Sequence, residues 1–170
     1  MVYGIIPDDV ERYASEMTQE LGVEVMISGS PEEVFHQSQF AATTTPSRKP
    51  YAKAEWLHPG MHITAMGADG EHKQELFADV LGKADRIVCD SKSQCFHLGE
   101  LHHALKEGIL TEDSDITEIG ELTSGIKFGR QDDQEITICD LTGVGVQDTT
   151  IAVLTYQKAI SSGLGTPFEV

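Results

Sequence analysis

The 170-residue chain carries 12 lysine and arginine residues against 28 aspartate and glutamate residues, a formal net charge of −16 at pH 7. A surface this acidic repels phosphate backbones and anionic lipid headgroups, so neither nucleic acid nor a membrane is an expected partner. The length is typical of one domain, and 39% hydrophobic residues suffice to build a buried core. The excess of acids indicates either an ordinary solvated surface or adaptation to salt.

The three cysteines, Cys89, Cys95 and Cys139, form no CxxC pair, and their odd number argues against a disulfide framework. The opening residues, MVYGIIPDDVERYA, contain neither a basic region nor a small-residue cleavage pattern. No apolar run approaches the roughly 20 residues that span a bilayer. We therefore expect a cytoplasmic protein, with Cys89 and Cys139 in the strand core.

Apolar periodicity and turn residues predict helices and strands that alternate along the chain. Helices are expected at residues 7–21, from 30 onward, 53–57, 71–83, 92–107 with Gly108 as its C-cap, 115–123 and 147–162. Strands are expected at residues 23–27, 40–45, 61–66, 86–90 and 135–141. Such alternation with short loops predicts an α/β fold of the doubly wound class, with a mainly parallel sheet.

The start of the chain departs from a complete dinucleotide-binding fold. Val2, Tyr3 and Gly4 resemble the end of a strand and lead directly into a helix. A dinucleotide fold normally begins with a strand and a glycine-rich turn at a helix N-terminus, where the pyrophosphate binds. Neither GxGxxG nor GxGxxA occurs here. The expected fold is therefore an incomplete Rossmann-type domain without its first strand and glycine-rich turn.

The loops that follow the predicted strands are the candidate site, because ligands of such sheets bind beyond the carboxyl ends of the strands. Four loops stand out, at residues 43–47, 67–70, 90–91 and 142–145. The threonines and proline of the first loop either line a nucleotide edge or simply form a turn. Asp69 in the second loop is placed either to act as a general base or to stabilise its turn.

Two further patterns have both functional and structural interpretations. Lys73 follows Asp69 by four residues, which on a helix would bring a cation beside the carboxylate or a phosphate, but it is equally explained as surface charge. Glu100 and His103 have i, i+3 spacing, typical of metal ligands on a helix. A second ligand pair is missing, however, and we expect no metal site.

Six segments together resemble the ornithine cyclodeaminase/μ-crystallin family in order and spacing. They are TTTPSRKP, WLHPGMHITAMGADGEHKQEL, ADRIVCDS, GELHHALKEGIL, EIGEL with GIKFGR, and EITICDLTGVGVQD. The resemblance runs from Tyr3 to about Lys158. Within the family, LHPGMHITAMGAD is most similar to the cyclodeaminase-like proteins of ectoine utilisation.

The resemblance implies a protein in two parts. An N-terminal half forms the homodimer of complete members and much of the substrate pocket, and a Rossmann half binds NAD or NADP. Residues 1–146 then correspond to a partial NAD(P)-binding domain, and residues 147–170 to a C-terminal helix and tail that pack toward an N-terminal domain. The family's first strand, its glycine-rich turn and the basic substrate-binding residues would lie before Met1.

For complete members, the resemblance implies hydride transfer between nicotinamide and an amino acid or ectoine-related compound, with an imine as product. Asp69 matches the aspartate of the family's GAD motif, whose implied role is proton transfer. The residues that match cofactor-contacting positions are Thr44, Thr45, Lys73, Asp90, Ser91, Thr142, Gly143 and Val144. Two other interpretations stay open: a noncatalytic NAD(P)- or ligand-binding protein of the μ-crystallin type, and an inactive fragment.

Overall fold

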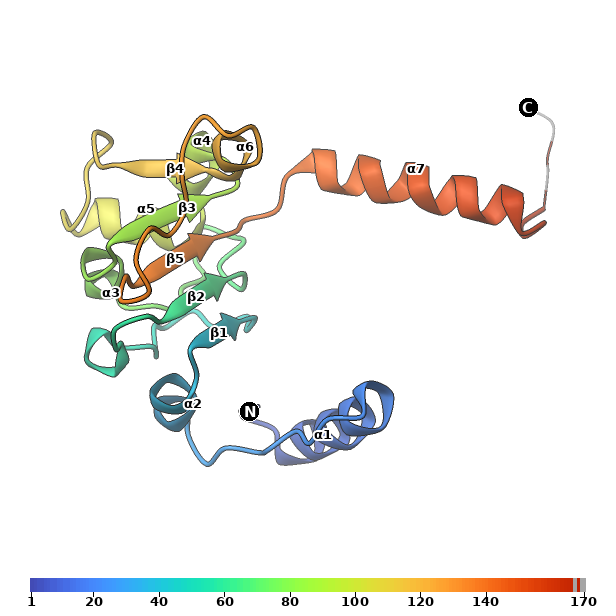
Figure 1. The fold of residues 1–170 in the computed structure, drawn as a ribbon, viewed down its shortest axis with the longest axis horizontal. Coiled ribbons are helices and arrows are strands. Elements are labelled where there is room, and N and C mark those ends of the chain that lie inside the picture. Colours follow the sequence, from blue (N-terminus) through green and yellow to red (C-terminus); the bar gives the residue numbers. More distant parts are fainter. Residues whose placement is uncertain (167, 169–170) are drawn as a thin grey trace.

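A five-stranded sheet forms the centre of the protein, whose computed structural model describes residues 1–166 and 168. The strands are β1 (Phe40–Thr43), β2 (His62–Ala65), β3 (Arg86–Cys89), β4 (Ile116–Glu118) and β5 (Thr137–Asp140). They lie side by side in the order β1-β2-β5-β3-β4, and every pair is parallel (Figure 1). The predicted α/β class with a parallel sheet is confirmed.

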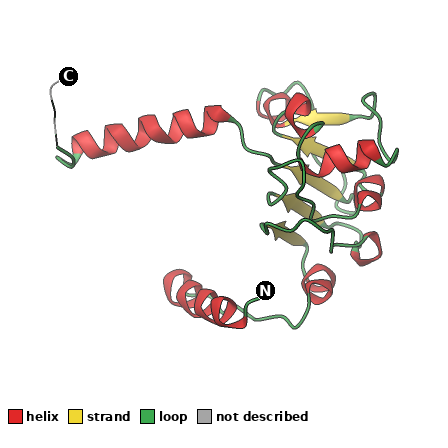
Figure 2. Cartoon of the chain, turned by 180° about the vertical axis from the view of Figure 1, so that it is seen from behind, coloured by secondary structure: helices red, strands yellow, loops and turns green. Residues whose placement is uncertain are grey.

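The helices connect the strands or extend from the ends of the chain. They are α1 (Pro7–Leu21), α2 (Pro31–Gln37), the 3-10 helix η1 (Ala54–Trp56), α3 (Ala78–Gly82), α4 (Lys92–Cys95), α5 (Gly99–Lys106), α6 (Ile119–Thr123) and α7 (Gly145–Ser161). Figure 2 shows most of the connecting helices on one side of the sheet, whereas α1 and α7 extend away from it. The Ser30 hydroxyl accepts a hydrogen bond from the Glu33 amide, which is the predicted N-cap of α2.

The hydrophobic core lies between the sheet and helices α3 and α5. Side chains alternate along each strand, and Ile63 of β2 and Ile87 of β3 are buried on the helix side. Leu81 of α3 and Leu101 of α5 are almost fully buried against them. Burial of this one face fixes the register of the strands.

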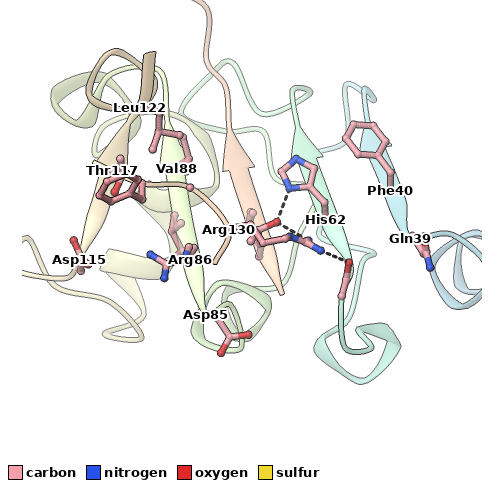
Figure 3. A pocket seen from close by; sticks show the side chains of 16 residues that line it. Gln39, Phe40, His62, Asp85, Arg86, Val88, Asp115, Thr117, Leu122 and Arg130 are labelled. Carbon is pink, nitrogen blue, oxygen red and sulfur yellow. Dashed lines mark hydrogen bonds between the residues drawn. The ribbon is translucent and has the colours of Figure 1, made fainter. Parts of the chain in front are cut away.

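The opposite face is covered only in part, by the segment that returns from β4 to β5. Arg130 of this segment donates hydrogen bonds to the Met61 carbonyl and the Thr137 hydroxyl, both at 3.1 Å. A cavity of about 410 Å³ lies on this face, and Figure 3 shows His62, Arg86 and Arg130 pointing into it. Because parallel sheets are normally buried on both faces, this surface is suited to further packing.

The prediction of a strand at residues 23–27 is wrong. Only Ile27 pairs, through an isolated parallel bridge to Val2. The Val2 amide donates to the Met26 carbonyl at 2.9 Å, and the Ser28 amide donates to Val2 at the same distance. In the part of the chain that the structure describes, no further strand flanks this bridge, so no ladder develops.

The expected helix at residues 71–83 is confirmed only in its second half, as α3. Leu76 instead forms a parallel bridge with Ala52. The Tyr51 and Ala52 amides both donate to the Glu75 carbonyl, at 2.8 and 3.0 Å. These tertiary bonds hold the backbone before Phe77 extended and override its helical pattern.

The expected helix at residues 92–107 divides into α4 and α5 at Gly99. This glycine has φ +76°, and a Cβ on it would lie 2.7 Å from one oxygen of Asp140. The break directs the Leu101 amide toward the same carboxylate, at 2.9 Å. Gly108, with φ +73°, ends the second helix as expected.

The expected helix at residues 115–123 is a strand in its first part and a helix only in its second part. Ile116 and Thr117 are buried, and Ile116 pairs with Ile87 of β3, so β4 precedes the short helix α6. The remaining expected strands agree with β1, β2, β3 and β5 to within two residues at either end. The expected helix at 147–162 is α7, and residues 167, 169 and 170 of the expected tail lie outside the described residues. A bilayer-spanning helix is absent from the described part of the chain.

Candidate functional site

The parallel register brings the ends of four strands to one edge of the sheet. Thr43, the last residue of β1, pairs with Ala65, the last residue of β2. Asp140, which ends β5, pairs with Ala65 on one side and with Cys89 at the end of β3 on the other. The four predicted loops therefore leave the sheet along the same carboxyl edge.

Asp90 joins the loop after β3 to the loop after β5. One carboxylate oxygen accepts the Thr142 amide at 3.0 Å and the Gly143 amide at 2.7 Å. The other oxygen accepts the Ser91 amide at 2.9 Å and the Thr142 hydroxyl at 3.2 Å. Cys95 also donates its thiol to Asp90. With these donors on both oxygens, the carboxylate holds the Thr142–Gly143 turn in place.

The turn itself presents open backbone at the edge. Gly143 is exposed, has φ +81°, and a Cβ on it would meet no atom within 4 Å. Thr142 beneath it is buried, and its hydroxyl accepts a hydrogen bond from Gln94 at 2.9 Å. Val144 follows and is half-buried. Glycine tolerates the positive φ at this position, and its lack of a side chain leaves free space above the turn.

The loop after β2 carries Asp69, which is exposed and forms an ion pair with Lys73. The predicted proximity of the two residues is confirmed, but it comes from a turn and not from a helix. In this turn the Lys73 amide donates to the Gly70 carbonyl at 2.9 Å. His103 of α5 contacts the Lys73 carbonyl through Nε2 at 2.8 Å, which anchors the turn to the core helix.

The loop after β1 presents one of its two candidate threonines to the exterior. Thr44 is exposed. Thr45 instead directs its amide and hydroxyl to one oxygen of Glu75, at 2.6 and 2.7 Å. Its polar groups are therefore satisfied within the protein.

The sequence did not predict the full burial of three acids behind this edge, Glu75, Glu100 and Asp140; of these, only Glu100 had been considered, as a possible metal ligand. The available signal was an acid inside an otherwise apolar segment, as in QELF, GELHHAL and TICDL. Burial is the main reason that the pKa of Glu100 rises to about 8 and the pKa of Asp140 to about 7. Asp140 Oδ1 has no hydrogen-bond partner among the described residues.

The histidines that suggested a metal site have other contacts. His102 and His103 pack edge to face, with ring centroids 5.1 Å apart. Burial lowers the pKa of His103. Among residues 1–166 and 168, no cluster of three or more potential ligands could hold a metal ion. Cys89 and Cys95 are buried and Cys139 is half-buried, all as free thiols.

The cavity on the open face is separate from this edge. Gln39, Asp85 and Asp115, which line it, each precede a strand, so the cavity lies toward the amino ends (Figure 3). None of the predicted site residues contributes to its lining. We attribute the cavity to incomplete cover of the sheet and place the candidate ligand site at the carboxyl edge.

The parallel sheet and its carboxyl-edge loops define a Rossmann-like α/β protein. The chain belongs to the ornithine cyclodeaminase/mu-crystallin family, whose model matches residues 1–163. The family predicted from the six segments is confirmed.

Three relatives illustrate the similarity. An uncharacterized cyclodeaminase of Sinorhizobium fredii is 42% identical over 159 residues, which cover 94% of this chain and 48% of that protein. A solved Delta(1)-pyrroline-2-carboxylate reductase of Thermococcus litoralis, in complex with NADH and L-proline, has a TM-score of 0.94 and 32% identity, covering 98% of this chain and 52% of that one. An archaeal alanine dehydrogenase dimer with bound NAD has a TM-score of 0.88 and 39% identity, covering 98% and 51%. The chain spans about half the length of the relatives it matches.

Proposed function

We propose that the chain is the cofactor-binding part of an NAD(P)-dependent oxidoreductase that acts on an amino acid or a related compound. The observation that carries the proposal is the Asp90-held turn, which leaves the Gly143 backbone open at the carboxyl edge close to the other strand-end loops. Support comes from two solved relatives of the same fold, whose structures contain NAD or NADH.

The described loops fit one end of a dinucleotide. Gly143 allows a planar ring to approach the backbone, and Thr44 and Ser91 carry hydroxyl groups in other loops of the same edge. The sequence contains no GxGxxG or GxGxxA turn for the phosphates, and its net charge of −16 adds no general attraction for them. We therefore assign the nicotinamide end to these loops and assign the phosphate contacts to a polypeptide that corresponds to the rest of the relatives.

When bound, the nicotinamide supplies hydride transfer to or from a substrate carbon. In this proposal Asp69 exchanges a proton with the substrate amine or with water, because it is an exposed carboxylate on the same edge. Lys73, paired with Asp69, holds the carboxylate on its turn. Asp90 acts indirectly, because its own oxygens already accept protein donors.

Helix α7 begins at Gly145, within two residues of the division that we propose between the cofactor-binding part, residues 1–146, and the C-terminal helix and tail, residues 147–170. Its long apolar side chains are exposed on several sides of the helix, among them Val146, Ile151, Leu154, Tyr156 and Ile160. A helix that is apolar around its circumference is normally buried. We propose that α7 packs against the polypeptide that corresponds to the other half of the relatives, and that the complete assembly is a homodimer.

The proposal is tested by completing the chain with the corresponding half of the archaeal alanine dehydrogenase and following nicotinamide absorbance. Alanine and proline are the first substrates to offer, and ectoine is the third because of the resemblance of LHPGMHITAMGAD. We expect turnover only in the completed protein, and Asp69→Asn should lower it by about 100-fold or more while cofactor affinity persists. Asp79→Asn, an exposed acid on α3, is the control.

Two results would count against parts of this account. Cofactor binding without turnover of any offered substrate would favour a noncatalytic binding protein of the μ-crystallin type. Association of the two halves that is unaffected by Leu154→Glu, measured by sedimentation velocity, would contradict the assigned role of α7.

A further inference from the structure

Glu75 is a buried carboxylate that connects two loops of the carboxyl edge. Its side chain is 0% exposed. One oxygen accepts the Thr45 amide at 2.6 Å, the Thr45 hydroxyl at 2.7 Å and the Tyr51 hydroxyl at 3.2 Å. The other oxygen accepts the Gly67 amide at 2.9 Å. The donors belong to the segment after β1 and the loop after β2, which are neighbours in the sheet.

The two loops also touch each other at Gly67. A Cβ on this residue would lie 2.2 Å from the Thr45 carbonyl oxygen and 2.5 Å from the second oxygen of Glu75. A side chain at position 67 is therefore excluded by backbone as well as by the carboxylate. Asp69 follows two residues later, and Thr44 precedes Thr45, so the Glu75 carboxylate lies directly behind two candidate site residues.

Glu75 is itself fixed to the core. Its amide donates to Glu100 Oε1 at 2.7 Å, and the next amide, that of Leu76, donates to Glu100 Oε2 at 3.1 Å. Its carbonyl accepts the Tyr51 and Ala52 amides. Glu100 is a fully buried residue in the first turn of α5. A continuous chain of hydrogen bonds thus runs from a core helix to the loops of the edge.

We propose that Glu75 is a positioning residue, which sets the loop carrying Thr44 and the loop carrying Asp69 in register at the cofactor edge; the inference rests on the function proposed above. A carboxylate is required because both of its oxygens face N–H donors. A glutamine can place only one oxygen, so its amide group would meet either the Thr45 amide or the Gly67 amide, donor against donor. The residue acts through the loops and needs no contact with substrate.

The test uses Glu75→Gln in the purified chain. Amide hydrogen exchange should be slow at Thr45 and Gly67 in the unaltered protein, because each of these amides donates a hydrogen bond to Glu75. In the variant, exchange should be at least about 10-fold faster where that bond is lost. NADH affinity, measured by calorimetry well below the unfolding temperature, should fall by a similar factor. Glu71→Gln, an exposed acid on the adjoining turn, should change neither quantity.

A second control separates positioning from general destabilisation. Leu81→Ala, a buried change on α3 outside both loops, should lower the unfolding temperature but leave NADH affinity and exchange at Gly67 unchanged. If Glu75→Gln does not fold, amide exchange in the unaltered chain still tests the inference. Rapid exchange at Thr45 and Gly67 there would overturn it. Unchanged exchange in a folded variant would do the same. Failure of the unaltered chain to bind either NADH or NADPH, with these amides protected, would instead count against the proposed function alone.

Discussion

Replacing Gly99 with alanine is expected to destabilise the folded chain by about 2–5 kcal/mol, the sum of a strained backbone and an overpacked site. The residue has φ +76°, and its Cβ would lie 2.7 Å from Asp140 Oδ2 and 2.8 Å from Thr142 Cγ2. Asp140 ends β5, and Thr142 lies in the loop after it, held by Asp90, so neither can move without disturbing the sheet edge. Denaturant unfolding of the two proteins measures the difference.

Gly108→Ala is the matched control for this prediction. Gly108 has nearly the same backbone, φ +73°, but a Cβ there would meet nothing within 4 Å. It should therefore show only the backbone cost, about 1–2 kcal/mol. Equal losses at the two glycines would mean that the close approach of Gly99 to Asp140 does not exist in solution.

The second large expected effect is that the buried Asp140 carboxyl makes the stability of the folded chain depend on pH. The pKa of Asp140 rises to about 7, chiefly through burial, from an ordinary value of 3.8. Between these values the folded chain keeps a proton that the unfolded chain releases, so raising the pH favours unfolding. The contribution is fully present below the ordinary pKa and is lost as the pH rises toward 7, at up to about 1.4 kcal/mol per pH unit.

Asp140→Asn should remove the share of this dependence that Asp140 contributes while keeping the fold; the share of Glu100, whose pKa burial raises to about 8, stays. Its amide oxygen can still accept the Leu101 amide, and its NH₂ group takes the place of the oxygen that has no partner among the described residues. Unfolding measured at several pH values between 4 and 7.5 should show the variant gaining stability relative to the original chain. Asp133→Asn, an exposed control, should follow the original profile. Parallel profiles for all three would show that Asp140 is already ionised in the folded state.

Local sequence patterns predicted most of the fold. Alternating apolar residues located β1, β2, β3 and β5, and the Ser30 and Gly108 signals located helix ends, because these features depend on neighbours along the chain. The errors occurred where distant partners decide. Glu100 and Ala52 hold residues 75–76 extended, and Ile87 draws Ile116 into a strand.

The candidate site was predictable as loops but not as contacts. The rule that ligands bind beyond strand ends selected Asp69, Asp90 and Gly143, whose loops the sheet register brings to one edge. Glu75 was missed because a buried acid leaves no periodic signal, and its four donors come from residues 8 to 30 positions away.

Calorimetric titration of the purified chain with NADH and NADPH tests the central claim, that the carboxyl edge holds a nicotinamide cofactor. We predict saturable binding of at least one of them at micromolar concentrations. Asp90→Asn should weaken this binding at least about 10-fold by disturbing the Thr142–Gly143 turn, whereas the exposed Asp113→Asn should not. The absence of binding heat for both cofactors, in a sample with a cooperative unfolding transition, would contradict the claim.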